Sequence, residues 1–344
     1  MPRPTLNHYV PRFYQKAFIT TGQTIFEFDL DNPSSGGTPR NVGKSAATQK
    51  LYPDSLETAL SKVENDQAPV IKRINQEKKI PTGKSRDKLL QFIALQHKRI
   101  EGNKENHRRK IEVVTNSVFN GMTASPLIEA KMQSFKKQYP EKLFVYLINN
   151  TKEIHWRGLN DLEIARIEND TAKDFFFSDH PAVIKNIKLN DPSHDSKGLT
   201  QQGCMIFLPT SPGIMVILYD RQHYWLKSKK NHYTVTERSD IDNLNLLQLY
   251  NCHQYIHYGR QTDLNYIRSL HSPHQTKIEQ TRKKLIILGD TVVRPDSTFI
   301  PELTFLEDRG KEITGNYRNK RIHGKLVSAS NKAREIWIKS LKFD

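Results

Sequence analysis

Residues 204–220 of this 344-residue chain, CMIFLPTSPGIMVILYD, constrain the fold more than any other stretch. Two runs of almost entirely apolar residues flank a short turn at 209–213, where Pro and Gly are concentrated. A strand with one face in water alternates apolar and polar residues, whereas a strand buried on both faces does not. We therefore expect an antiparallel hairpin that other elements cover on both sides.

Two helices are expected upstream, because apolar residues recur there at helical spacing. The first is expected over 54–75, with a kink or a break at Pro69. The second is expected over 84–100, with Ser85 as its N-cap. Gln96 lies on the apolar face of the second helix, so its amide must be hydrogen-bonded, either to a backbone segment or at a site.

The remaining elements are shorter. We expect strands at 25–28 and 142–148, a loop over 31–45, a hairpin over 162–186, helices at 239–257 and 262–288, extended chain over 290–305, and a helix at 330–341. The sequence thus predicts an α+β fold in which antiparallel hairpins pack with several helices. We divide it into a domain over 1–258 and a basic C-terminal extension over 259–344.

The positive charge of the chain is concentrated in two segments. Of 53 Lys and Arg residues, 13 lie in 72–110 and 10 in 309–342, with only 4 and 2 acidic residues beside them. The rest of the chain is close to neutral, with 30 basic and 31 acidic residues. Focused positive potential attracts phosphate backbones, so nucleic acid is the expected partner, with RNA favoured over DNA. The alternative is that both segments are solvated surfaces that keep the protein soluble.

Several classes of protein are excluded by composition. Two cysteines, Cys204 and Cys252, cannot make a disulfide scaffold or a four-thiolate zinc site. No apolar run approaches the roughly 20 residues of a membrane span, and the N-terminus lacks a signal-peptide pattern. We expect a cytoplasmic protein with no membrane contact, no metal and no cofactor. A protein partner or a homo-oligomer remains open.

Three clusters of polar residues are candidates for a site. The first is the N-terminal segment with His8, Tyr9, Arg12 and Tyr14. Histidine titrates near neutral pH and can act as general acid or base, while Arg and Tyr can hold phosphate oxygens. The alternative is a segment docked on the core by its aromatic side chains.

The second cluster lies on the predicted helix over 84–100. Gln96 and Arg99 are three residues apart and are therefore neighbours on the helix surface, where they could hold a phosphate or a base edge. His97 falls off the apolar face, and we expect it to be exposed to solvent.

The third cluster is Ser178, Asp179 and His180, which follow an aromatic strand and precede Pro181. Asp179 could orient His8 or a water molecule, or it could bond its own backbone in an Asx turn. His253 and His257 are four apart on the predicted helix over 239–257, but no further ligands complete a zinc motif.

These clusters, in this order, resemble the DUF4238 family, a bacterial domain of unknown function. The resemblance spans about 7–258 and rests on NHYVPRFYQKAF at 7–18, QFIALQHKR at 91–99, FFFSDHPAVIKN at 175–186, IFLPTSP at 206–212 and LNLLQLYNCHQYI at 244–256. The chain departs from the family pattern at Gln15, usually Leu, and at His180, usually Asn. The resemblance implies a shared framework of His8, Tyr9, Phe13, Gln96, Arg99, Asp179 and Asn245.

Charge and clusters together lead to three hypotheses. The first is a protein that acts on nucleic acid, such as a metal-independent, RNA-cleaving effector of toxin or phage-defence type. In it His8 is the general base, Arg99 stabilises developing charge and Asp179 orients His8; Tyr9, Arg12, Tyr14, Gln96, Ser178, His180 and Asn245 bind substrate. The second is a non-enzymatic nucleic-acid-binding subunit of a larger complex. The third is an enzyme for a small anionic substrate.

Overall fold

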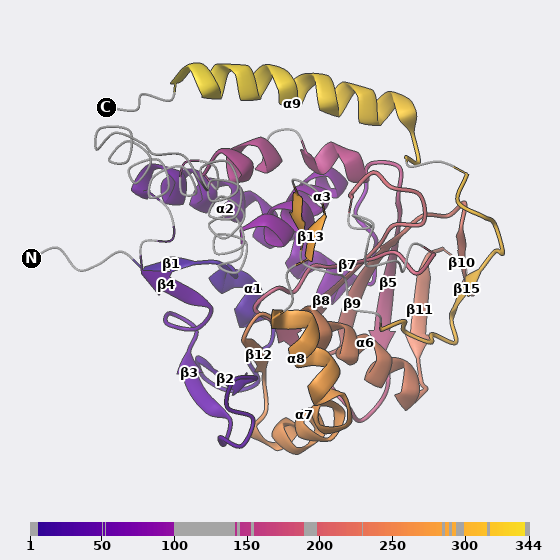
Figure 1. Cartoon of the computed structure of the whole chain (residues 1–344). Coiled ribbons are helices and arrows are strands. Elements are labelled where there is room, and N and C mark those ends of the chain that lie inside the picture. Colours follow the sequence, from indigo (N-terminus) through magenta and orange to yellow (C-terminus); the bar gives the residue numbers. More distant parts are fainter. Residues whose placement is uncertain are drawn as a thin grey trace, which may run out of the picture.

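The architecture is α+β, as a computed structural model of the chain shows (Figure 1). It describes residues 6–49, 51, 53–99, 142, 145–152, 155–188, 198–228, 230–283, 286–288, 291–293, 299–314 and 317–340. Its longer helices are α2 (Asp54–Glu77), α3 (Gly83–Lys98), α6 (Arg238–Asn251) and α9 (Lys320–Ser340). Shorter ones are α1 (Arg12–Lys16), α7 (Leu264–His271), α8 (Gln275–Lys283) and the 3-10 turns η1 (His155–Leu159), η2 (Gln261–Asp263) and η3 (Ser272–His274).

A five-stranded sheet forms the centre of the molecule. Its strand order is β11 (His232–Val235), β5 (Glu163–Asn169), β9 (Ile214–Tyr219), β8 (Met205–Ser211) and β7 (Val183–Lys185). All neighbours are antiparallel except β11 and β5. The strands β8 and β9 form the hairpin expected over 204–220, with Phe207 opposite Ile217.

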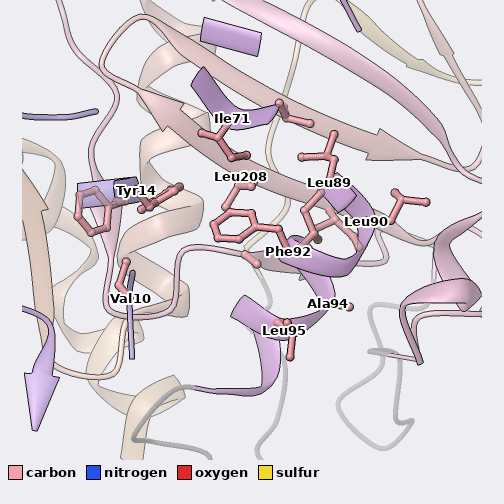
Figure 2. Close-up of a cluster of buried hydrophobic side chains, with 14 of the residues drawn as sticks. Val10, Tyr14, Ile71, Leu89, Leu90, Phe92, Ala94, Leu95 and Leu208 are labelled. Atoms are coloured by element: carbon pink, nitrogen blue, oxygen red, sulfur yellow. The ribbon is translucent and has the colours of Figure 1, made fainter. Parts of the chain in front are cut away.

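Both faces of this sheet are covered, as the unbroken apolar runs predicted. One face, with Ile206, Leu208 and Val216, belongs to the core cluster that also contains α2 and α3. Figure 2 shows Leu208 of the sheet between Ile71 of α2 and Phe92 of α3, in the same cluster as Leu89, Leu90 and Leu95 of α3. The other face, with Phe207, Met215 and Ile217, packs against Ile241, Leu244 and Leu247 of α6.

A second sheet of four strands joins the N-terminal part of the chain to the region after α6. Its order is β3 (Thr38–Asn41), β2 (Thr24–Asp29), β12 (Tyr255–Tyr258) and β6 (Phe177–Ser178). Side chains of α6, α7 and α8 share its core cluster, so α6 packs against both sheets. Three strand pairs complete the description: β1 (Leu6–His8) with β4 (Ala47–Gln49), β10 (Tyr224–Leu226) with β15 (Leu306–Asp308), and β13 (Ile286–Leu288) with β14 (Thr291–Val293).

Three predicted elements were wrong. Residues 145–152 are helical rather than a strand, because a short apolar run does not distinguish the two by periodicity. The span 162–186 is not a hairpin, since β5 pairs with β9 and β11 while β6 joins the other sheet. The helix expected over 239–257 ends at Asn251, and the strand β12 follows it.

The bounds of several other elements also differ from those predicted. The helix α2 continues through Pro69 without a break. Thr82, rather than Ser85, precedes the first turn of α3. The loop over 31–45 contains β3, the span 262–288 is divided among α7, η3, α8 and β13, and the last helix is longer than expected. Residues 100–110 of the first basic segment lie outside the described part of the chain.

Several described segments after residue 258 pack on the rest of the molecule. The strand β15 pairs with β10, and Phe305 is fully buried in the core beside α6. Figure 1 shows α9 along the edge of the molecule, on the side away from α7 and α8, and its described residues contact η1. Among the described residues no helix has the length and apolar character to cross a bilayer.

Candidate functional site

The N-terminal segment lies across the end of α3, where two polar side chains hold its backbone. The Gln96 amide nitrogen donates to the carbonyl oxygen of Tyr9 at 2.9 Å, and Arg99 donates to that of His8. Gln96 is fully buried and Arg99 nearly so. The first two clusters therefore meet, and the contacts of Gln96 and Arg99 brace a backbone.

The charge of Arg99 is neutralised inside the protein. Its Nη1 lies 2.6 Å from Oε1 of Glu64 on α2, and the Arg99 side chain is 3% exposed. Burial raises the pKa of the neighbouring Glu57 carboxyl above its usual value, although the positive charge of Arg99 opposes this shift. A buried cation needs a partner of this kind, so a substrate phosphate would have to displace Glu64 to reach the guanidinium.

The side chains of the N-terminal segment differ widely in exposure. Burial, with the nearby Arg12 guanidinium, lowers the pKa of the half-buried His8, which favours its neutral form at neutral pH. Arg12 is exposed at the start of α1. Tyr9 is buried, and Tyr14 is fully buried, donates its hydroxyl to the Pro209 carbonyl and has a pKa well above its usual value because of that burial.

Asp179 holds the connection between α6 and β12. Its carboxylate accepts the backbone N–H groups of His253, Gln254 and Tyr255 at 2.7, 2.6 and 3.0 Å. Among the described residues, the Asp179 carboxylate forms neither an Asx turn with its own backbone nor a hydrogen bond with His8. A carboxylate with three N–H donors makes strong, charge-assisted hydrogen bonds, so Asp179 fixes the geometry of the chain around it.

The neighbours of Asp179 have similar roles. The Ser178 hydroxyl and the Ser178 N–H both donate to the Gln248 amide oxygen at 3.0 Å. The Asn245 amide donates to the Asp174 carbonyl at 3.0 Å and accepts the Phe176 N–H at 3.3 Å. The side-chain amides of Asn245 and Gln248 both belong to α6, and their hydrogen bonds hold this helix against β6 and the residues just before it.

His97 and His180 join the second cluster to the third. Their rings stack, with centroids 5.1 Å apart, and Nε2 of His180 lies 3.2 Å from Nδ1 of His97. His97 is half-buried rather than exposed, because the turn after β6 packs against the end of α3. All three clusters are therefore neighbours in space.

His253 and His257 do not share a helix. His257 lies in β12, fully buried, with its Nδ1 3.3 Å from the Ser45 hydroxyl and 3.7 Å from a Glu27 carboxylate oxygen. The Ser45 hydroxyl itself donates to Glu27 at 2.8 Å. Burial lowers the pKa of His257, although Glu27 and Asp179 oppose the shift. In the described ranges, no group of three or more His, Cys, Asp or Glu side chains could hold a metal ion.

The two basic segments meet at a pocket that sequence reasoning missed. This pocket has a volume of about 610 Å³ and is lined from one side by residues 80–82 and Arg86, where α2 gives way to α3. Arg318 and Asn319, at the foot of α9, line it from the other side. The long sequence separation of these parts left no local signal for it.

Arg318 anchors the foot of α9. Its guanidinium donates to the carbonyl oxygens of Gly158, Leu199 and Gln201 at 2.6 to 2.7 Å and pairs with Asp161 at 2.9 Å. The side chain of Asn319 then accepts the N–H groups at the start of α9, as a helix-capping residue does. The position of α9 is thus set by charged and capping contacts at its first turn.

One face of α9 is basic and open to solvent. Lys320, Arg321, Lys325 and Lys332 are exposed. Ile322, Leu326, Ala329 and Ala333 recur at spacings of four and three and are half-buried. Near the α2–α3 junction, Lys72, Arg73, Lys78, Lys79 and Lys84 are exposed as well. These exposed side chains are not part of the pocket lining, to which the two basic segments contribute residues 80–82, Arg86, Arg318 and Asn319.

We expect Asp179→Asn to destabilise the protein by about 1.5 to 3 kcal/mol, because an amide nitrogen cannot accept the backbone N–H that it would face. Urea unfolding monitored by circular dichroism measures the change. Asp170→Asn, at an exposed aspartate, is the matched control and should leave the unfolding midpoint unchanged. Equal midpoints for wild type and Asp179→Asn would show that these three bonds do not stabilise the fold.

We expect the free energy of unfolding to fall below pH 6.5 in part through His257. Its pKa in the folded protein lies below the usual 6.5, so the unfolded chain takes up the proton first as the pH drops. The loss approaches about 1.4 kcal/mol per pH unit for one such group and is absent above pH 6.5. Urea unfolding at pH 7.5 and pH 5 should show a smaller decrease in His257→Gln than in wild type. Identical decreases would exclude this contribution.

Comparison with known proteins gives a family and no closer relative. The model of the family described as "Protein of unknown function (DUF4238)" matches residues 7–262. Searches of curated proteins and of solved structures found no match to this chain. The matched range contains every residue of the three clusters and ends shortly before α7. The chain therefore belongs to the DUF4238 family.

Proposed function

We propose that this protein binds nucleic acid, with RNA as the expected class, through the exposed basic face of α9 and the lysines near the α2–α3 junction. The observation that carries the proposal is that two basic segments, more than 200 residues apart in sequence, both contribute residues to one pocket, while their exposed Lys and Arg side chains lie outside its lining. Clustered lysine and arginine side chains supply sequence-independent affinity by releasing counterions from phosphates.

The helix α9 has the charge and the geometry of a phosphate-binding element. It carries six Lys or Arg residues and a single acidic residue, Glu335. Arg321, Lys325 and Lys332 are separated by four and seven residues, so they share one face and are spaced by about 6 and 10 Å along the axis. All three side chains are exposed.

Binding is favoured over catalysis by the contacts of the residues expected to catalyse. Arg99 is committed to Glu64, and the Asp179 carboxylate is committed to three backbone N–H groups. Gln96, Tyr14, Ser178 and Asn245 are fully buried. These residues support the fold around His8 and leave little polar surface for a substrate.

The triple variant Arg321→Gln, Lys325→Gln, Lys332→Gln tests the interface. We expect weaker binding to single-stranded RNA in fluorescence anisotropy, and a slope of log affinity against log salt that is smaller by about 2, since each lost phosphate contact on a single strand contributes about 0.7.

The matched control is Lys16→Gln, Lys44→Gln, Lys277→Gln, which removes the same charge from exposed positions outside the two basic segments. It should retain the wild-type salt slope. Equal losses in both triple variants would mean that net charge alone attracts RNA, and no binding by the wild type would refute the proposal.

RNA cleavage is a second candidate, and one observation favours it. His8 is partly exposed, and its lowered pKa favours the neutral imidazole, which suits a general base. In this model, labelled RNA is cut in the presence of EDTA, and His8→Ala abolishes cutting while binding persists. Intact RNA after prolonged incubation with the wild type, or full cutting by His8→Ala, would remove this candidate.

A further inference from the structure

The pocket between the α2–α3 junction and the foot of α9 has a chemistry of its own. Three arginines line it, Arg86, Arg221 and Arg318, and three carboxylates, Asp161, Glu163 and Asp220. The formal charges of these six side chains cancel. The pocket lining therefore carries no net formal charge, although both basic segments contribute residues to it.

The charged groups of the pocket are also occupied. Arg86 donates to the carbonyl oxygens of Asn160 and Leu162, and Arg318 is held by Asp161 and three carbonyl oxygens. Arg221 lies 3.2 Å from Glu163. Asp220 accepts the N–H groups of Gly203 and Gln222. A phosphate entering this pocket would gain no net charge attraction.

The remaining groups suit a planar, polar ring. The exposed side-chain amides of Asn160 and Gln222 can each donate and accept hydrogen bonds. Ile80 and Pro81 add half-buried apolar surface. The Arg221 guanidinium, 72% exposed and tied to Glu163, presents a flat face of the kind on which bases stack.

We propose that this pocket receives an unpaired nucleobase of a bound single strand, whose phosphates lie on the basic residues around it. The inference rests on the proposed function and narrows it to single-stranded nucleic acid. The volume of about 610 Å³ falls within the range of small-ligand pockets. A base in a duplex is stacked and paired, and its Watson–Crick edge cannot reach these amides.

The double variant Asn160→Ala, Gln222→Ala tests the pocket. It keeps the hydrogen bonds from Arg86 to Asn160 and from Gln222 to Asp220, because Asn160 and Gln222 take part in them through backbone atoms only. We expect affinity for single-stranded RNA of mixed sequence to fall roughly 5- to 100-fold, the range of a good contact to a base edge. Affinity for the same strand annealed to its complement should not change.

A second variant and a control secure the result. Thr82→Trp places a large side chain at an exposed position of the pocket lining and should produce the same selective loss. Gln261→Ala, Asn265→Ala removes two exposed amides away from the pocket and should bind both RNAs like wild type.

The outcomes separate the inference from the proposed function. Wild-type affinity for the single strand in both pocket variants, with weakened binding in the α9 triple variant, would overturn the inference and leave the nucleic-acid interface standing. Equal losses for single strand and duplex would also overturn it. If the wild-type protein binds neither RNA, the proposed function fails and the inference fails with it.

Discussion

The burial of β8 and β9 on both faces is the constraint on which the rest of the structure depends. Ile206 and Leu208 face α2 and α3, while Phe207 and Ile217 face α6. Burying apolar side chains of this size contributes about 1.5 to 3 kcal/mol each relative to leaving them exposed. Neither helical layer can be removed without exposing one face of the hairpin, so the parts of the chain before and after the hairpin are bound into one unit.

Hydrogen bonds from buried polar side chains to the backbone are the second set of interactions that hold the structure together. Gln96, Arg99, Asp179 and Asn245 all donate to or accept from backbone groups far away in sequence. A buried backbone group without a partner is costly, and loops that enter a core need side chains to satisfy them. The residues of the DUF4238 framework thus have a structural reason to occur together, whatever ligand the protein binds.

The sequence predicted the fold class and the central hairpin because both depend on local patterns of apolar residues. It did not distinguish helix from strand at 145–152, nor β12 from the end of α6, since short apolar runs satisfy both periods. The meeting of the three clusters was open, because it depends on long-range contacts such as that between His97 and His180. The pocket could not be predicted from the sequence for the same reason. Only the positive charge of the two segments that contribute to its lining could be recognised.

The anchoring of Arg318 has a consequence for how the C-terminal part can be separated from the rest. Its guanidinium satisfies carbonyl oxygens of η1, at Gly158, and of the turn at Leu199 and Gln201, and it neutralises Asp161. A truncated chain that ends before this residue would leave those acceptors without their donor, so its defects would reflect damage to η1 and this turn as much as a missing helix. A chain that stops just after Asn319 would retain the anchor and lose only α9. Deletion boundaries in this protein are therefore set by one side chain and not by the limits of a sequence family.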